Sequence, residues 1–90
     1  MAIEVRIPTI LRTYTNGEKA VDAEGATLVD LVENLEASYP GLGERLLDNG
    51  ELRRFINVYV NDEDVRFEGG LAKELADGDV VVILPAVAGG

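Results

Sequence analysis

The chain has 90 residues, which suffice for one domain with a small hydrophobic core and leave no room for a second domain. Its 8 Lys and Arg residues against 17 Asp and Glu residues give a net charge of −9, which argues against binding to nucleic acid or to an anionic membrane surface. Cysteine and histidine are both absent, which excludes a disulfide framework, a thiol nucleophile and a zinc–thiolate site, and removes the commonest general base.

The N-terminal stretch does not resemble a targeting segment. Residues 1–6 lack the charged start and long apolar core of a signal peptide, and no window of the chain has the length and hydrophobicity of a membrane span. We therefore expect a cytoplasmic protein.

The first third of the chain predicts a β-hairpin. Apolar and charged residues alternate over residues 2–8, which indicates a half-buried strand. Asn16-Gly17 favours a turn, because both residues tolerate positive φ, and a second short strand is expected over residues 18–22. The connecting loop is expected to be long and partly irregular, with Ile10 and Leu11 helping to cover the core.

A helix follows the hairpin. Residues 27–30 resemble a capping box, and Pro40 is expected to end the helix because it cannot continue the hydrogen-bond ladder. Between these limits, four apolar residues fall at the i, i+3, i+4 and i+7 positions of a single helix face. This face comprises Leu28, Leu31, Val32 and Leu35.

The second half of the chain returns to strands. A further short helix is expected over residues 42–47, and β-branched and aromatic residues predict a third strand over residues 55–60. A polar turn and a short strand over residues 65–67 should follow, then one helical turn within residues 71–75. The last strand, over residues 80–84, is apolar at every position.

The polar turn at residues 61–64 has the composition of a calcium loop, but its spacing is wrong. Arg66 stands where a further ligand is needed, and the later residues do not fit the loop pattern. We expect a solvated turn here and no metal site.

The final segment joins an apolar strand to two glycines. Pro85 has no N–H for a sheet ladder and is expected to end the strand. Residues 86–90 carry small side chains and are expected to form a flexible tail that extends roughly 20 Å from Pro85 to the carboxylate. Two interpretations are open: a slim tether that carries the carboxylate into another protein's active site, or a glycine-rich end without function.

The order of elements predicts an α+β fold. A last strand that is apolar throughout suits a central position, and placing it parallel to the first strand gives one mixed, five-stranded sheet. The main helix then lies across one face, accompanied by short helical turns. This arrangement is similar to the β-grasp fold of ubiquitin, and we expect it to span residues 1–85.

Three motifs within this framework resemble the ubiquitin-like sulfur carriers of the ThiS/MoaD family, whose members serve thiamin and molybdopterin synthesis. They are Val60-Asn61 with Val65, the run Asp77-Gly78-Asp79-Val80, and the terminal residues 84–90. The resemblance covers the full length of the chain. Residues 7–12 and 54–67 are similar, more closely still, to the branch of the family that serves cysteine biosynthesis.

The resemblance implies a function for the tail. In the family, a ubiquitin-activating-like adenylyltransferase and sulfurtransferase adenylates the C-terminal carboxylate with ATP and converts it to a thiocarboxylate. This residue is Gly90, and Val87, Ala88 and Gly89 are expected to thread into the partner's active site. In the cysteine branch, a PLP-dependent cysteine synthase takes the sulfur and a zinc-dependent protease releases cysteine. The carrier itself is expected to bind no cofactor and to be a co-substrate, not an enzyme.

A docking surface is expected on the last strand. Side-chain alternation sends Val81 and Ile83 to one sheet face and Val82 and Leu84 to the other. The resemblance implies that the first pair meets the helix, which leaves the second pair on the open face as an apolar patch for a partner. The alternative is a set of neighbours covered by loops. The expected docking patch comprises Val82, Leu84 and either Phe55 or Ile56.

Other functions remain open at the level of sequence. The sulfur acceptor is alternatively a precursor of thiamin, molybdopterin or another metabolite. A second alternative is a ubiquitin-like protein modifier whose Gly90 is joined to lysines, and a third is an acidic interaction domain with an idle tail. A small thiocarboxylated protein and a ladder of larger conjugates are the products that distinguish the first two.

Overall fold

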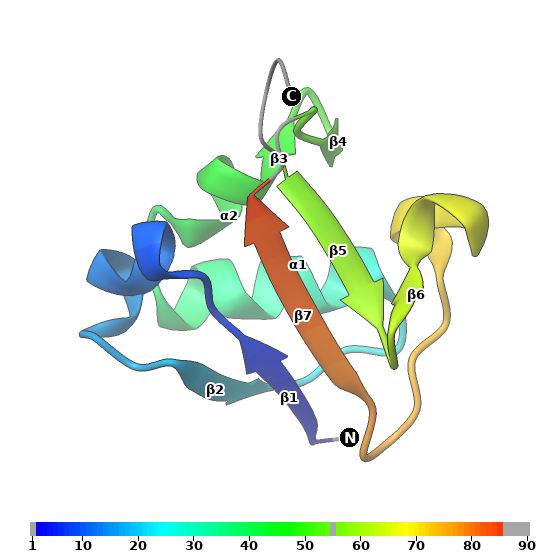
Figure 1. The fold of residues 1–90 in the computed structure, drawn as a ribbon, viewed down its shortest axis with the longest axis horizontal. Coiled ribbons are helices and arrows are strands. Elements are labelled where there is room, and N and C mark those ends of the chain that lie inside the picture. The colour runs from blue at the N-terminus through cyan, green and yellow to red at the C-terminus, as the bar shows by residue number, and fades with distance from the viewer. Residues whose placement is uncertain (1, 55, 86–90) are drawn as a thin grey trace.

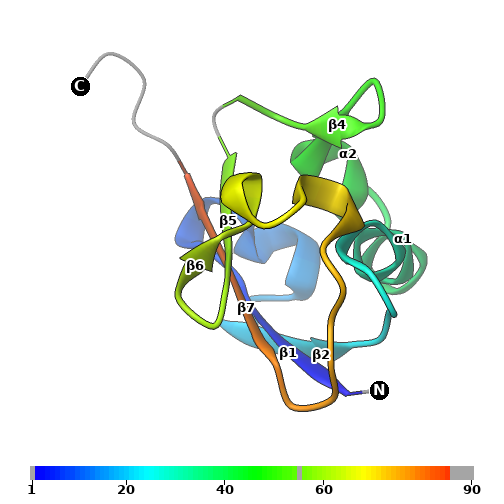
Figure 2. The ribbon, with the colours of Figure 1, turned by 90° about the vertical axis from the view of Figure 1, so that its right-hand side faces the viewer.

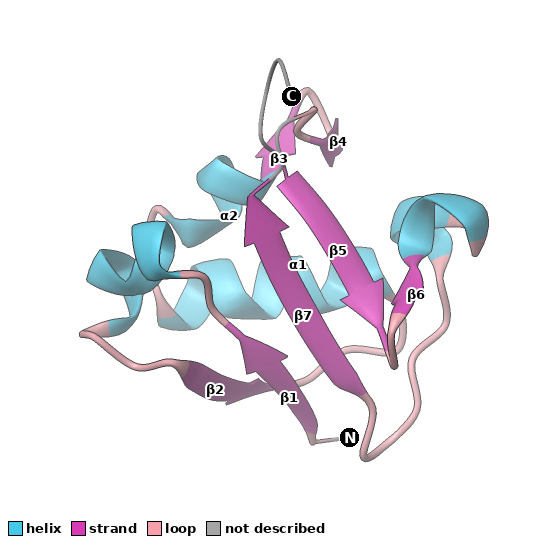
Figure 3. Cartoon of the chain, viewed as in Figure 1, coloured by secondary structure: helices cyan, strands magenta, loops and turns pink. Residues whose placement is uncertain are grey.

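The computed structural model describes residues 2–54 and 56–85, and it confirms the predicted α+β architecture. Within these residues, five strands form one mixed sheet in the order β2-β1-β7-β5-β6, and α1 lies across one face of it (Figures 1 and 3). The elements of the sheet and its cover are β1 (Ile3–Arg6), β2 (Ala20–Ala23), α1 (Leu28–Ser38), α2 (Leu42–Leu46), β5 (Ile56–Val60), β6 (Glu63–Asp64) and β7 (Val80–Pro85).

Strand β7 occupies the centre of the sheet, as predicted from its apolar sequence. It pairs in parallel with β1, with Val5 opposite Val81, and antiparallel with β5, with Val58 opposite Ile83. Seen along the sheet, α1 lies on one side of it, and within residues 2–54 and 56–85 neither α1 nor α2 covers the opposite face (Figure 2). Residues 81 and 82 of β7 are therefore held between two neighbouring strands, and the strand has one covered and one open face.

Helix α1 begins and ends where its sequence predicts. Thr27 caps it, because its hydroxyl oxygen accepts a hydrogen bond from the Asp30 N–H at 3.4 Å. At the other end, the Tyr39 N–H donates to the carbonyl of Leu35 at 2.7 Å and Pro40 follows. The apolar face is buried, and each of its side chains stabilises the fold by about 1.5–3 kcal/mol. These residues are Leu28, Leu31, Val32 and Leu35.

The connection between β1 and β2 is more regular than expected, and one of its two predicted core residues is not buried. Residues Thr9–Thr15 form a 3-10 helix, in which adjacent side chains point in directions about 120° apart. Leu11 accordingly turns into the core with 5% exposure, whereas Ile10 is 61% exposed. The prediction that Ile10 covers the core is wrong.

The strand predicted over residues 65–67 is also wrong. β6 is shorter and lies earlier, at Glu63–Asp64, and Val65–Phe67 form a 3-10 turn instead. The reason is local: the Asp64 carboxylate accepts a hydrogen bond from the Arg66 N–H at 2.9 Å, which caps the turn and removes that N–H from the sheet.

A small hairpin beside α2 was not predicted. Strands β3 (Leu47–Asp48) and β4 (Glu51–Leu52) pair around Asn49 and Gly50, which both have positive φ. Leu47, expected in the short helix, starts β3 after the helix ends at Leu46. The Asn-Gly pair between two leucines was the signal for this hairpin. The helical turn expected within residues 71–75 lies at Gly70–Ala72.

The path from β2 to α1 depends on the absence of a side chain at Gly25. A Cβ atom there would lie 2.5 Å from the backbone nitrogen of Leu31 and 2.9 Å from the carbonyl carbon of Asp30. Helix backbone cannot yield as a flexible side chain does. The close approach sets how tightly α1 sits on the end of β2.

We predict that Gly25→Ala lowers the free energy of unfolding by about 2 kcal/mol or more, because the new methyl group pushes α1 away from the sheet. Urea denaturation measures the change. Gly17→Ala is the control: its φ is +84° but no atom lies within 4 Å of the added methyl. That variant should lose about 1 kcal/mol through backbone strain alone. Equal losses in the two variants would show that crowding at Gly25 is unimportant.

Candidate functional site

The candidate site is the carboxyl end of β7 together with the sheet face that α1 leaves open. Val81 and Ile83 are 1% and 2% exposed and belong to the core, as predicted. Val82 is half-buried and Leu84 is 43% exposed on the other face. The alternation that places these two residues on the open face is confirmed, and their role in docking stays a prediction.

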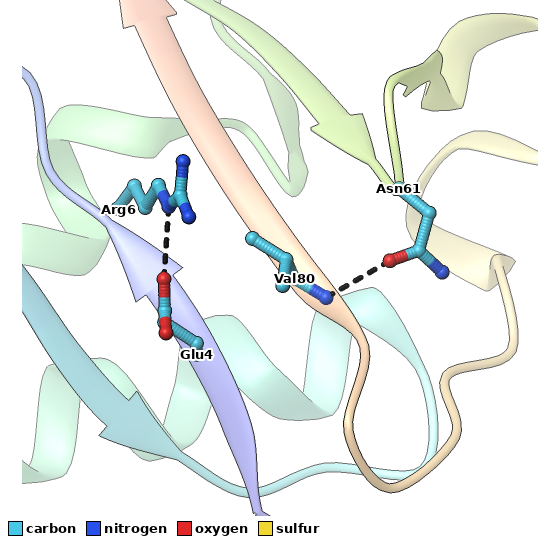
Figure 4. A network of polar contacts seen from close by, with 4 residues as sticks. All are labelled: Glu4, Arg6, Asn61 and Val80. Carbon is cyan, nitrogen blue, oxygen red and sulfur yellow. Dashed lines mark hydrogen bonds and ion pairs between the residues drawn. The ribbon is translucent and has the colours of Figure 1, made fainter.

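The neighbours of Val82 are less apolar than the sequence suggested. In the sheet register Val82 lies between Arg6 on β1 and Tyr59 on β5. Arg6 forms an exposed ion pair with Glu4, with 2.8 Å between its Nε and the Glu4 carboxylate (Figure 4). Ile56, one of the two residues considered as a companion of the patch, is 6% exposed and belongs to the core instead. The apolar part of the open face is therefore narrow.

A groove of about 540 Å³ lies beside the end of β7. It opens because β1 stops pairing at Arg6, opposite Val82, whereas β7 continues to Pro85. Beyond β1 the chain turns at Pro8 into the 3-10 helix, whose first turn forms the opposite wall. The lining residues are Arg6, Ile7, Pro8, Thr9, Ile10, Arg12, Lys19, Ala20, Val82, Ile83, Leu84 and Pro85.

Two of the three exposed large hydrophobic side chains in the described part of the chain line this groove. Across residues 2–54 and 56–85, the exposed large hydrophobic side chains are Ile10, Leu84 and Phe67, and the first two line the groove. Sequence reasoning assigned Ile10 to the core and so missed its place here. Pro8 is the sequence feature that could have indicated this groove, because it ends β1 early and leaves the side of β7 uncovered.

The start of β7 is fixed by a side-chain clasp from Asn61. The Asn61 side-chain oxygen accepts a hydrogen bond from the Val80 N–H at 3.1 Å (Figure 4), and its amide nitrogen donates to the Asp79 carboxylate at 2.9 Å. The Asn61 backbone N–H also donates to the Val80 carbonyl at 2.9 Å. Asn61 has a φ of +50°, which asparagine tolerates better than most residues. The clasp joins the β5–β6 turn to the central strand.

The Asp79 carboxylate is stabilised in its charged form. The Ala76 N–H donates to it at 2.8 Å, and this bond, followed by the bond from Asn61, lowers the pKa of Asp79 below its usual 3.8. A lowered pKa in the folded state contributes stability above the unfolded pKa and loses it as the pH falls through the folded value. The clasp therefore stabilises the protein at neutral pH and weakens below about pH 4.

The polar turn at Asn61 and Asp62 is a hairpin turn, with positive φ at both residues. In the part of the chain that the structure describes, no group of three or more acidic side chains is placed to hold a metal ion. On β6, the pKa of Glu63 is raised, chiefly by a hydrogen bond and like charge shared with Glu68.

No helix among the described residues is long and apolar enough to cross a membrane.

The residues expected to carry the chemistry lie outside the described residues. These are Gly90 as the reactive carboxylate and three tail residues that thread into a partner. Phe55, proposed for the docking patch, and the expected tail of residues 86–90 are likewise not described. These assignments stay predictions. The tail residues concerned are Val87, Ala88 and Gly89.

Comparison with known proteins identifies relatives over the whole chain. The ThiS family model matches residues 5–90. The sulfur carrier protein CysO of Mycobacterium tuberculosis is 60% identical over 93 residues, with 100% of both chains covered. The crystal structure of M. tuberculosis CysO superposes with a TM-score of 0.92 at 59% identity, covering 94% of this chain and 99% of that one.

Two further relatives bear on function. A chain in the crystal structure of the Amycolatopsis orientalis BexX/CysO complex is 58% identical and superposes with a TM-score of 0.94, covering 99% of this chain and 100% of that one. Small archaeal modifier protein 3 of Haloferax volcanii is 38% identical over 93 residues, with 100% of both chains covered. Together with the observed sheet order, these similarities confirm the β-grasp, ubiquitin-like fold.

The clasp predicts a pH-dependent defect in Asn61→Asp. The new side chain keeps the acceptor for the Val80 N–H but places a second carboxylate against Asp79. One of the two then holds a proton with a raised pKa, so stability is lost as the pH rises through that value. We expect a loss of about 1–3 kcal/mol at pH 7 and a clearly smaller loss at pH 4, measured by urea denaturation.

Asn16→Asp is the matched control for this experiment. Asn16 also has positive φ, at +56°, and makes no side-chain hydrogen bond within the described residues. Its replacement adds the same charge without a hydrogen-bonded carboxylate partner and should change stability little at either pH. A loss in Asn61→Asp that is independent of pH would contradict the role given to Asp79.

Proposed function

This chain belongs to the ThiS family, and on that premise we propose that it is a sulfur carrier protein, a co-substrate of partner enzymes and not itself an enzyme. The observation that carries the proposal is 60% identity, over the whole of both chains, to a protein known as the sulfur carrier CysO. The absence of cysteine and histidine fits this role, because the sulfur would reside on the C-terminal residue and the catalytic groups on the partners. We place this function in the cytoplasm.

The proposed chemistry activates Gly90. A carboxylate is a poor electrophile, so a ubiquitin-activating-like adenylyltransferase first joins it to the α-phosphate of ATP, and pyrophosphate leaves. A sulfur nucleophile supplied by the sulfurtransferase activity of the same partner then forms a bond to the acyl carbon as AMP departs. The resulting thiocarboxylate is ionised and nucleophilic at neutral pH and needs no cysteine in the carrier.

We propose cysteine biosynthesis as the pathway, in keeping with the similarity to CysO. The thiocarboxylate sulfur displaces the leaving group of an activated serine held by a PLP-dependent cysteine synthase, which gives a thioester. The serine-derived amine lies close to the acyl carbon, so its intramolecular attack moves the acyl group from sulfur to nitrogen. The amide that forms is stable, and a zinc-dependent protease releases cysteine from it.

The fold supports this role through the placement of β7. The central strand is held by two neighbours and by the Asn61 clasp, and Pro85 ends it at the edge of the groove. We propose that residues 86–90 form a slim tether, in which Val87, Ala88 and Gly89 enter the partner's active site ahead of Gly90. The BexX/CysO complex supports partner docking, because in it a relative of this chain is assembled with another protein.

A second candidate function is that of a ubiquitin-like protein modifier. The similarity to small archaeal modifier protein 3 favours it, at 38% identity over the full chain. Both functions begin with adenylation of Gly90 and differ in the nucleophile that follows, sulfur or a lysine amine. A thiocarboxylate that serves thiamin, molybdopterin or another metabolite is a third possibility within the same chemistry.

The direct test is the mass of the C-terminal peptide. With the activating enzyme, ATP and a sulfur source, the intact protein should gain about 16 mass units on its last residue, because one sulfur atom replaces one oxygen atom. With a PLP-dependent cysteine synthase and O-phosphoserine, the thiocarboxylated protein should then gain one cysteine residue in amide linkage. The protein with an ordinary carboxylate should gain nothing from the synthase.

Two tail variants are the controls for this test. Gly89→Phe places a bulky side chain next to the reacting residue, and one residue added after Gly90 moves the carboxylate. Neither should be thiocarboxylated, although both should fold. A wild-type thiocarboxylate that ignores the cysteine synthase but delivers sulfur to a thiazole or molybdopterin synthase would contradict the cysteine assignment. A ladder of lysine conjugates without thiocarboxylate would favour the modifier function.

The open face predicts the effect of Leu84→Glu. Leu84 is 43% exposed, so the change should leave the melting temperature almost unaltered, yet it should weaken binding to the activating enzyme by about tenfold. Calorimetric titration measures the affinity. Phe67→Glu, at an 86% exposed residue away from the groove, is the matched control and should leave affinity within about twofold. Equal weakening in the two variants would remove Leu84 from the docking patch.

A further inference from the structure

The basic side chains of this acidic protein gather at the end of β7. A second groove, of about 470 Å³, lies on the other side of Pro85, which together with Ile10 lines both grooves. Although acidic residues outnumber basic ones by 17 to 8, neither groove has an acidic residue in its lining. Five of the eight basic residues line the two grooves: Arg6, Arg12, Lys19, Arg45 and Arg53.

Most of these positive charges are held in place without being neutralised. The Nε of Arg12 donates to the Ile7 carbonyl at 3.2 Å, and the Nε of Arg53 donates to the Glu44 backbone carbonyl at 2.7 Å. Both acceptors are uncharged backbone carbonyls, so within the described residues neither guanidinium group is paired with a carboxylate. They fix the position of each side chain and leave its outer N–H groups free for another acceptor.

The remaining charges follow the same pattern. Arg45 donates to the Tyr14 hydroxyl at 2.6 Å and lies 5.6 Å from the centre of its ring. Lys19 has no side-chain partner among the described residues. Arg6, with its exposed bond to Glu4, is the exception. Within residues 2–54 and 56–85, the other four basic residues of the grooves form no ion pair with a carboxylate.

The length of the tail restricts what can face this surface. Five residues follow Pro85, and an extended chain of that length spans at most roughly 18 Å. Any partner that takes Gly90 into its active site must therefore approach the end of β7. The surface around the entrance to that active site must then lie over the grooves. Its contact surface would meet exposed Ile10 and Leu84 surrounded by basic groups.

We propose that the two grooves dock an acidic segment of the activating enzyme, in which carboxylates meet Lys19 and Arg12 while an apolar side chain covers Ile10 and Leu84. This inference rests on the proposed function and names the chemistry of its first partner. Charge complementarity selects the occupant, because an acidic surface is repelled by the rest of this chain and attracted here. The aliphatic walls favour a protein segment over a free phosphate, which would need polar groups on several sides.

Such a surface should act mainly on the rate and orientation of docking. Exposed charges contribute little to the lifetime of a complex, but they steer encounter and lose this effect as salt screens them. The overall negative charge would turn the protein so that its basic end faces an acidic partner. The tail leaves the fold at that same end, so orientation and delivery coincide.

The sequence provides a matched pair of lysines for the test, since Lys19 and Lys73 are the two lysines of the chain. Lys19 lines the groove, whereas Lys73 lies in neither groove and close enough to Glu63 and Asp79 to act on their charges. Lys19→Glu and Lys73→Glu change the net charge equally. Their melting temperatures are measured first, so that altered folding is recognised.

We expect Lys19→Glu to slow association with the activating enzyme by about fivefold or more at low salt, and by less than about twofold in 0.5 M NaCl. Lys73→Glu should stay within about twofold of wild type in both conditions. Biolayer interferometry with the immobilised enzyme measures the rates. Equal effects in the two variants, or an effect of Lys19→Glu that high salt does not reduce, would overturn the inference.

Carbodiimide cross-linking gives an independent measurement on the unaltered protein. The reagent joins an amine to a carboxylate only when the two are in contact, so Lys19 should be linked to an Asp or Glu of the activating enzyme. Lys73 serves as the internal control and should remain free of such links. Peptide mapping that finds links at Lys73 and none at Lys19 would contradict the proposal.

Two further outcomes would assign the surface to another occupant and overturn the inference. Inorganic pyrophosphate that shifts the NMR signals of Arg12 and Lys19 at submillimolar concentration would indicate a phosphate site. A dimer in sedimentation velocity that Lys19→Glu dissociates would indicate a second copy of this chain.

Thiocarboxylation separates a failure of the inference from a failure of the proposed function. Wild-type protein that is thiocarboxylated while Lys19→Glu reacts with unchanged kcat/KM leaves the carrier function standing and overturns the acidic docking segment. Wild-type protein that neither binds the activating enzyme nor gains sulfur overturns both. The inference predicts a lowered kcat/KM and an unchanged kcat for Lys19→Glu.

Discussion

The structure depends on the position of β7 between β1 and β5. Parallel pairing with β1 brings the last strand beside the first, so the core contains side chains from both ends of the described chain, Val5 and Val81 among them. The Asn61 clasp fixes where β7 enters the sheet, and the sheet register then determines every residue that follows it. A slip of one residue would exchange Val81 and Ile83 for Val82 and Leu84 and bury the wrong face.

Patterns within one element were readable from the sequence, whereas arrangements that need distant residues were not. The four-residue stripe of α1 and the alternation along β7 predicted their buried faces, because periodicity reports directly on burial. Predictions for short segments were wrong because one local contact can decide their structure. At Val65–Phe67, a single hydrogen bond from the Arg66 N–H to the Asp64 carboxylate outweighs a composition that favours a strand. The Asn49-Gly50 signal was present in the sequence, but the two short strands on either side of it were not predicted.

The candidate site likewise combines features that local sequence patterns predict with features that only the fold creates. The open-face position of Val82 and Leu84 follows from local alternation and could be predicted. The basic grooves could not, because they combine the end of β1, the 3-10 helix and the region around α2, which meet only in the fold. Ile10 shows the difference most clearly, since an isoleucine beside a leucine gives no indication of which one faces the solvent.

Parallel pairing of β1 and β7 also determines that the start of the first strand and the end of the last strand lie at opposite ends of the sheet. Ala2 lies at the entry end of the central strand, where its N–H binds the Asp77 carboxylate at 2.8 Å and its carbonyl accepts from the Gly78 N–H. Pro85 lies at the exit end of the strand (Figure 1). Val80 and Pro85 are five residues apart, which corresponds to roughly 16 Å along β7. The amino end of the fold therefore offers a natural attachment point: an affinity tag, fluorophore or surface linker placed ahead of Ala2 would stand at the far end of the sheet from the grooves and from the residues that follow Pro85.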